Sequence, residues 1–181
     1  ANDDGTITDA DRQHCGSTIP KYQLGMNFGL DYKGFDLQVQ LSGAFGHMAF
    51  NGPRSAYDRF DDNSNYRADY DPWTSENPNA KDPRPIYGDS RNVRAEQDRW
   101  LENGNYLKVK QIALGYNLLK SILGDVFSQI RVYVNAQNLI TFTSYQGLDP
   151  EFLNSNIWDR SYDGASYPNP YGVTFGAQIT F

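Results

Sequence analysis

Five stretches of the sequence alternate apolar residues with polar residues or glycine, which is the pattern of a β-strand with one apolar face. Strands are predicted at about residues 21–32, 35–48, 105–118, 129–142 and 172–181. In the first stretch the apolar positions are Tyr22, Leu24, Met26, Phe28, Leu30 and Tyr32. The pattern predicts an all-β chain whose long strands present their apolar sides to one common environment.

Two local signals refine these strands. Residues 33–34 form a Lys-Gly pair that predicts a tight turn, so the first two strands make a long hairpin. The third stretch changes phase between Val109 and Ile112. A β-bulge near Lys110 and Gln111 would restore one continuous apolar face.

The apolar faces run for about nine to twelve residues, whereas strands of soluble sandwiches average about five or six. Tyr or Phe stands at one or both ends of each face, and the opposite face is rich in Gln, Asn, Lys and Asp. This length and this aromatic bracketing are typical of strands tilted across a bilayer, with the polar face toward a wet lumen. The sequence therefore favours a transmembrane antiparallel β-barrel.

The connections alternate in length. Joints at 33–34 and 119–129 are short, and the second has room for one helical turn, while the spans 1–20, 49–104 and 143–171 are long and polar. Because outer-membrane barrels have short periplasmic turns and long outer loops, the long spans are predicted to be extracellular. Five strands cannot close a barrel, which needs about eight or more, so we expect the chain to be a piece of a larger protein.

Four ordered motifs carry a family resemblance. They are ENGNYLKVK at 102–110, IALGY at 112–116, RVYVNAQNL at 131–139 and GLDPE at 147–151. In this order they resemble the C-terminal end of SusC/RagA-family TonB-dependent outer-membrane transporters.

The resemblance implies a barrel of about 22 strands with an N-terminal plug. It further implies import of oligosaccharides or peptides across the outer membrane, a SusD-like surface lipoprotein as lid, and energy from TonB–ExbB–ExbD acting through an N-terminal part absent from this sequence. Outer-membrane lipid would surround the barrel, and no cofactor is required. The final strand, with Phe175, Ile179 and the terminal Phe181, resembles the signal by which the barrel-assembly machinery recognises its substrates.

The segment "ANDDGTITDAD" has the layout of an EF-hand-type calcium loop. Asn2, Asp4 and Asp11 supply side-chain oxygens, and Thr6 offers its carbonyl. The first ligand position would precede Ala1, so the alternatives are a Ca²⁺ site or a plain Asp/Gly turn. The same loop supports the alternative reading of the whole chain, a secreted calcium-binding β-sandwich that binds carbohydrate.

Aromatic residues in the long loops are candidates for contact with substrate or lid, or for pinning the loops together. The candidates are Tyr66, Tyr70, Trp73, Trp100, Trp158 and Tyr162. On the polar face, Lys108, Lys110, Arg131 and Asp36 would line the path or, as buried charges require, pair with charges of the plug.

Other chemistry is weakly supported. A net charge of −6 argues against a nucleic-acid partner. His14 and His47 stand alone, and Cys15 cannot form an internal disulfide. Among the carboxylates, Asp149 with Glu151 and Asp61 with Asp62 suggest no catalytic pair and are expected to be solvated loop residues. The chain is predicted not to be an enzyme.

Overall fold

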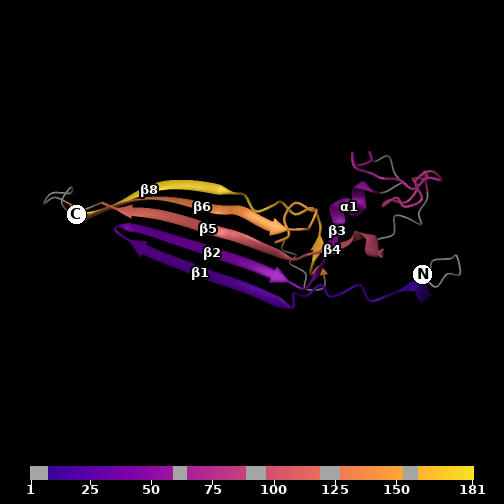
Figure 1. Ribbon diagram of the computed structural model, residues 1–181, viewed down its shortest axis with the longest axis horizontal. Helices are drawn as coiled ribbons and strands as arrows, with labels where there is room; N and C mark the ends of the chain where they lie inside the picture. Colours follow the sequence, from indigo (N-terminus) through magenta and orange to yellow (C-terminus); the bar gives the residue numbers. More distant parts are fainter. Residues whose placement is uncertain (1–7, 59–64, 89–96, 119–126, 153–158) are drawn as a thin grey trace.

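The computed structural model describes residues 8–58, 65–88, 97–118, 127–152 and 159–181. Its main body is a long five-stranded sheet in which every neighbouring pair is antiparallel (Figure 1). The strands, in spatial order, are β1 (Tyr22–Tyr32), β2 (Phe35–Phe45), β5 (Tyr106–Asn117), β6 (Gln129–Thr143) and β8 (Gly172–Thr180). The sheet is open, with β1 and β8 at its two edges in the described part of the chain.

The register places the apolar positions of all five strands on one face. Met26 lies beside Leu41, Leu41 beside Val109, and Val109 beside Ile140. This face is exposed along β1 and β8 and half-buried to exposed on the three strands between them, and within the described residues no second sheet covers it. The sandwich alternative requires such a cover, because exposed apolar rows on this scale are unfavourable in water.

The expected β-bulge is present. The register of β5 against β2 shifts where Gln40 pairs with Gln111 and Leu41 with Val109, which leaves Lys110 as the extra residue. The pairing of β5 with β6 shifts at the same level, where Asn138 adopts a positive φ of 52°. The bulge keeps the apolar residues on both sides of it on one face, as the phase change in the sequence predicts.

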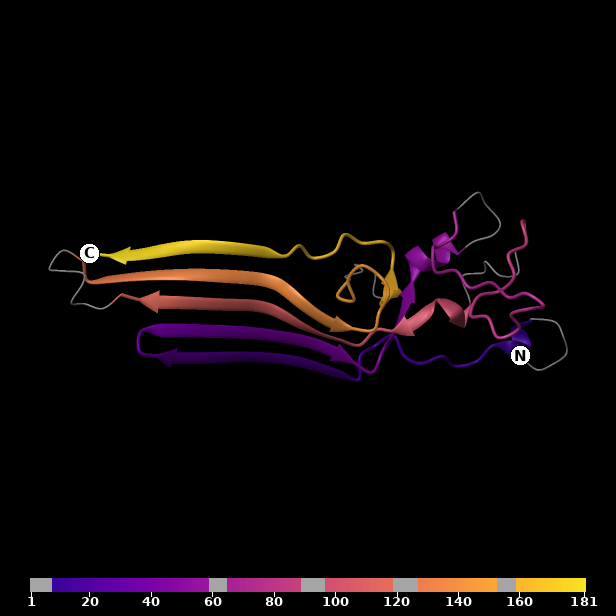
Figure 2. The same cartoon turned by 45° about the horizontal axis from the view of Figure 1, so that its top comes forward.

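A second, smaller body stands at one end of the long sheet, opposite the 33–34 turn and the C-terminus (Figure 2). It contains a three-stranded sheet with the order β4-β3-β7, in which β3 and β7 are parallel. Its elements are β3 (Met48–Asn51), α1 (Gly52–Tyr57), η3 (Asp98–Trp100), β4 (Leu101–Asn103) and β7 (Tyr162–Asp163). We call the described residues 48–58, 65–88, 97–104 and 159–166 the loop unit.

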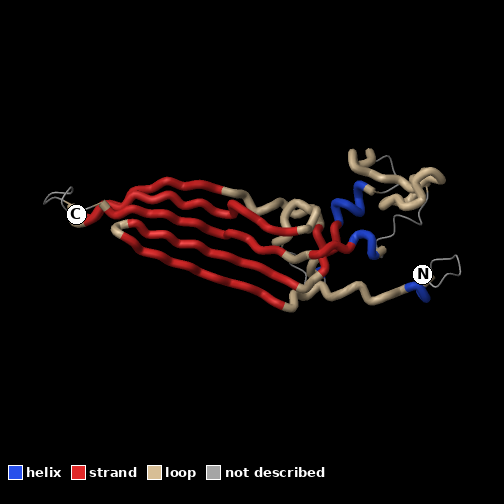
Figure 3. The backbone as a smooth tube through the Cα atoms, viewed as in Figure 1, coloured by secondary structure: helices blue, strands red, loops and turns tan. Residues whose placement is uncertain are grey.

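The loop unit departs from the prediction that 49–104 is a simple loop, and the predicted second strand, 35–48, is too long. Gly46 takes a φ of 79° after Phe45, so the chain turns and Met48 opens a different sheet. Helices are few and short (Figure 3), with η1 at Asp9–Asp11 near the start of the described chain. Within the described ranges no helix is long and apolar enough to cross a membrane. The helical turn expected in the 119–129 joint falls mostly at 119–126, outside the described residues.

Candidate functional site

The apolar face of the long sheet ends in aromatic residues on both sides. At the turn end, Tyr32, Phe35 and Tyr116 are neighbours across three strands, and the rings of Phe35 and Tyr116 lie 4.5 Å apart. At the loop end, Tyr22 pairs with Phe45. Aromatic side chains at both rims of an apolar band match the interfaces of a bilayer, where one edge is apolar and the other wet.

The polar face carries a band of side-chain amides. Asn27, Gln40, Gln111 and Gln137 lie side by side across four strands. Amides donate and accept hydrogen bonds without carrying charge. This part of the face can therefore bind neutral polar groups.

At the turn end, the polar face bears an ion pair. The guanidinium of Arg131 donates from Nε to Asp36 Oδ2 at 2.9 Å and from Nη2 to Asp36 Oδ1, and it lies over the ring of Tyr133 at 5.0 Å. Gly115 leaves the room that this pair needs, because a Cβ there would meet both Asp36 and Arg131. Arg131 and Asp36 are predicted to line the path or to pair with charges of the plug, but in the structure each is the other's partner within this chain.

At the loop end, two lysines and two carboxylates form a cluster that we call the tether. Lys108 Nζ donates to Asp149 Oδ2 at 2.9 Å and to Glu151 Oε2 at 3.1 Å, and Lys110 Nζ donates to Glu151 Oε2 at 2.7 Å. The side-chain amide of Asn169 donates hydrogen bonds to both carboxylates. The prediction that Asp149 and Glu151 are solvated loop residues is wrong, since Asp149 is buried and both are ion-paired.

The ionisation of Asp149 reflects this setting. Burial alone would raise the pKa of Asp149, but hydrogen bonds from Lys108 and from the backbone N–H groups of Glu151 and Asn169 outweigh it. The pKa of Asp149 consequently lies below its ordinary value of 3.8. The carboxylate is charged at neutral pH and holds its lysine.

Inside the loop unit, arginines surround a fully buried carboxylate. Asp58 contacts Arg67 Nε at 2.7 Å, Arg54 Nε at 3.5 Å and Arg99 Nη2 at 3.8 Å. Asp82 joins two of these arginines, at 3.4 Å from Arg67 and 3.5 Å from Arg99. Burial of charge requires such partners, so this cluster fixes α1, the 65–88 segment and η3 to one another.

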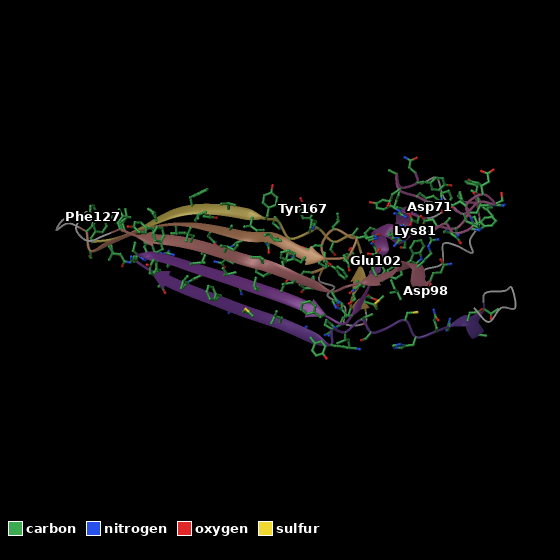
Figure 4. The ribbon with its side chains drawn as sticks, in the orientation of Figure 1. Asp71, Lys81, Asp98, Glu102, Phe127 and Tyr167 are labelled. Carbon is green, nitrogen blue, oxygen red and sulfur yellow. The ribbon has the colours of Figure 1, made fainter. Side chains whose placement is uncertain are left out.

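Glu102, on β4 (Figure 4), joins the two long loops. Its carboxylate accepts from the backbone N–H of Gln146 at 2.8 Å and from Arg54 at 3.2 Å. Nearby, the hydroxyl of Tyr145 donates to the buried Asp163 at 2.7 Å. Burial, followed by that hydrogen bond, raises the pKa of Tyr145. Both contacts make the 49–104 and 143–171 loops one body.

The loop aromatics have divided roles. Trp100 is 0% exposed and lies under the guanidinium of Arg99, so in this chain it offers no surface to substrate or lid, contrary to expectation. Tyr66 stacks on Tyr70, whose hydroxyl donates to the Pro83 carbonyl and whose pKa burial raises to about 12.

The remaining loop aromatics are still candidates. Tyr162 stacks on Phe50 at 5.2 Å yet stays partly exposed, as does Trp73. Trp158 lies outside the described residues. For these side chains, contact with substrate or lid remains a prediction.

Of the calcium candidates, Asn2, Asp4 and Thr6 lie outside the described residues, as do Asp61 and Asp62. Asp11 is described, and its carboxylate accepts from the backbone N–H of Thr8 at 2.8 Å in a capping box. In the described part of the chain, no group of three or more His, Cys, Asp or Glu could hold a metal. Calcium binding stays a prediction.

The residues of the proposed assembly signal lie at the exposed edge strand or just after it. Phe175 is 80% and Phe181 83% exposed, and Ile179 is also exposed. The ring of Phe181 contacts that of Phe127 at 5.5 Å. Their recognition by assembly machinery remains a prediction.

These features define a class of protein. A long antiparallel sheet with an exposed apolar face, aromatic rims and a polar reverse face has the character of a membrane β-barrel wall. The loop unit at one end matches the uneven loops of such barrels.

Comparison with known proteins gives the family. No family model matches the chain. TonB-dependent receptor P3 of Formosa agariphila is 34% identical over 185 residues, covering 98% of this chain, and TonB-dependent receptor P26 of the same organism is 30% identical over 188 residues, covering 99%. The chain spans only 18% and 19% of the length of these relatives.

Solved structures of a related importer also resemble the chain. The RagAB peptide importer in its closed-closed state matches with a TM-score of 0.72 and 26% identity, over 92% of this chain and 18% of that chain. Its open-open state matches with a TM-score of 0.70 and 26% identity, over 90% of this chain and 17% of that chain. The chain belongs to the SusC/RagA family of TonB-dependent receptors. The proteins it resembles are named as receptors and as a peptide importer.

Proposed function

We propose that this chain forms part of the barrel wall and outer mouth of a TonB-dependent importer in the outer membrane. The observation that carries the proposal is the opposite character of the two faces of the long sheet. The apolar face, exposed along β1 from Tyr22 to Tyr32, suits lipid, and the amide-rich face suits a wet lumen. The open edges at β1 and β8 would pair with further strands of a barrel of about 22.

The proposed partners follow from the RagAB similarity and from the geometry. A SusD-like surface lipoprotein would cover the mouth beside the loop unit, and TonB–ExbB–ExbD would act through the N-terminal part of the full receptor. The substrate is an oligosaccharide or a peptide. RagAB is a peptide importer, and the amides of the polar face suit the hydrogen-bonding groups of either class.

Paired substitutions on neighbouring residues test the wall. In the full-length receptor, Phe28→Arg places a charge on the apolar face and Asn27→Arg places the same charge on the polar face. A charge facing the bilayer midplane costs about 2–4 kcal/mol, while a lumen charge is tolerated. We expect Phe28→Arg to reduce the heat-modifiable, folded receptor in outer membranes far more than Asn27→Arg does. Equal loss in both variants contradicts the assignment of the faces.

Orientation and transport are tested separately. In a Cys15→Ser background, a cysteine at the exposed Glu76 of the loop unit should react with a membrane-impermeant maleimide on intact cells, and one at Lys33 should not. Uptake of labelled peptides and oligosaccharides by cells with and without the receptor, and with TonB inactivated, then identifies the cargo. Uptake that is independent of both the receptor and TonB refutes the proposed function.

A further inference from the structure

The tether joins two motifs that are distant in the sequence. Lys108 and Lys110 belong to β5, in the wall, whereas Asp149 and Glu151 belong to the loop that follows β6. Figure 2 shows the chain after β6 curling back beside the segment that leads into β8. Part of this loop therefore lies across the polar face at its loop end, rather than extending away from the sheet.

The tether is compensated in charge, and its Lys108–Asp149 half is buried. The side chain of Lys108 is 3% exposed and that of Asp149 is 9% exposed. Two lysines face two carboxylates, and Asn169 donates from its backbone to Asp149 Oδ2 at 3.1 Å. In the buried half, removing one partner is costly, because the charge that remains is left desolvated.

The same loop is also fastened to the loop unit. Just before the tether, Gln146 is bound by Glu102, and Tyr145 is bound by Asp163. Residues 145–152 therefore run from an anchor in the loop unit to an anchor on the wall. We call this segment the strap.

We propose that the strap is a fixed constriction across the outer end of the polar face, and that Lys108 and Lys110 are the positioning residues that hold it there. The inference rests on the proposed function, because only in a barrel does the polar face border a passage. The strap narrows that passage for solutes that the receptor does not import, and it sets the position of both long loops relative to the wall.

The test uses the full-length receptor expressed in a host that lacks its own copy. Glu151→Lys places a cation against Lys108 and Lys110, and Lys110→Glu places an anion against Glu151. The double variant, Lys110→Glu with Glu151→Lys, restores one opposite pair. Asp69→Asn, at an exposed carboxylate of the loop unit, is the matched control.

Two readouts are taken on intact cells, namely cleavage of the loop by an added protease and susceptibility to vancomycin, a bulky hydrophilic antibiotic that the outer membrane normally excludes. We expect several-fold increases in both for each single reversal, a return toward the unaltered receptor in the double variant, and no change for the control. Only heat-modifiable, folded receptor is compared. If a reversal prevents assembly, the isosteric Asp149→Asn with Glu151→Gln variant gives the readout.

If the folded single variants or the folded isosteric variant show unchanged cleavage and unchanged vancomycin entry, the proposal that the strap is a constriction is refuted. Increased cleavage without increased entry also refutes it, and leaves a structural fastening only. Failure of the proposed function is distinct from either result, because it appears as cargo uptake that does not depend on the unaltered receptor.

Discussion

Removal of the buried charge of Asp58 tests the architecture of the loop unit most directly. Asp58 is completely buried and contacts Arg54, Arg67 and Arg99 at 2.7 to 3.8 Å. Asp58→Asn keeps the volume but leaves guanidinium charge uncompensated, and breaking a buried ion pair on one side costs about 3–5 kcal/mol. At the lower limit, local opening of the loop unit becomes about 100-fold more frequent, since about 1.4 kcal/mol corresponds to a factor of ten.

Hydrogen exchange of the full-length receptor in detergent measures this opening. The reporters are the backbone N–H of Phe50, which donates to Ser161 at 2.7 Å, and that of Gly104, which donates to His47 at 3.0 Å. Asp69→Asn is the control, because its carboxylate binds the same Arg67 but is 79% exposed, and such pairs contribute less than about 1 kcal/mol. Equal exchange in the two variants, or faster exchange spread through the long sheet, refutes the reasoning.

Three further outcomes are expected. Deletion of Ala113 shifts Leu114 and Tyr116 by one position and turns them onto the polar face, so folded receptor is lost, whereas a one-residue deletion in the exposed 75–79 turn is tolerated. Burial lowers the pKa of His47 below 6.5, so the folded state resists protonation, and exchange of the loop unit should increase as pH falls below 6.5 and stay unchanged above it. Gly52→Ala should separate β3 from β7, because its Cβ would overlap a backbone oxygen of β7, whereas Gly25→Ala has open space and should leave exchange unchanged.

The long sheet could be predicted from the sequence because its signals are local. Period-two alternation fixes which residues share a face, and the Lys-Gly turn fixes the register of β1 against β2. Even the bulge at Lys110 is visible as a change of phase between Val109 and Ile112. Each of these signals lies within one strand or one hairpin.

The loop unit could not be predicted, because its strands pair across long stretches of chain. β3 forms its parallel pair with β7, and Trp100 becomes buried only when the 49–104 segment folds on itself. A polar loop sequence gives no sign of that closure. The sequence does contain one signal for the tether, because two lysines in one family motif and two carboxylates in another have complementary charge. Complementary charge alone does not show that the two motifs are in contact.

On the polar face, the charged residues and the amides have different roles. Asp36 and Arg131 are paired at the turn end, and Lys108 and Lys110 are paired on the loop half, while the band between them consists of amides. A desolvated charge needs one permanent partner, whereas an amide can exchange partners, including water, at a lower cost in free energy. The charged residues therefore form the permanent contacts. The amide band is the part of this wall that can bind a solute transiently.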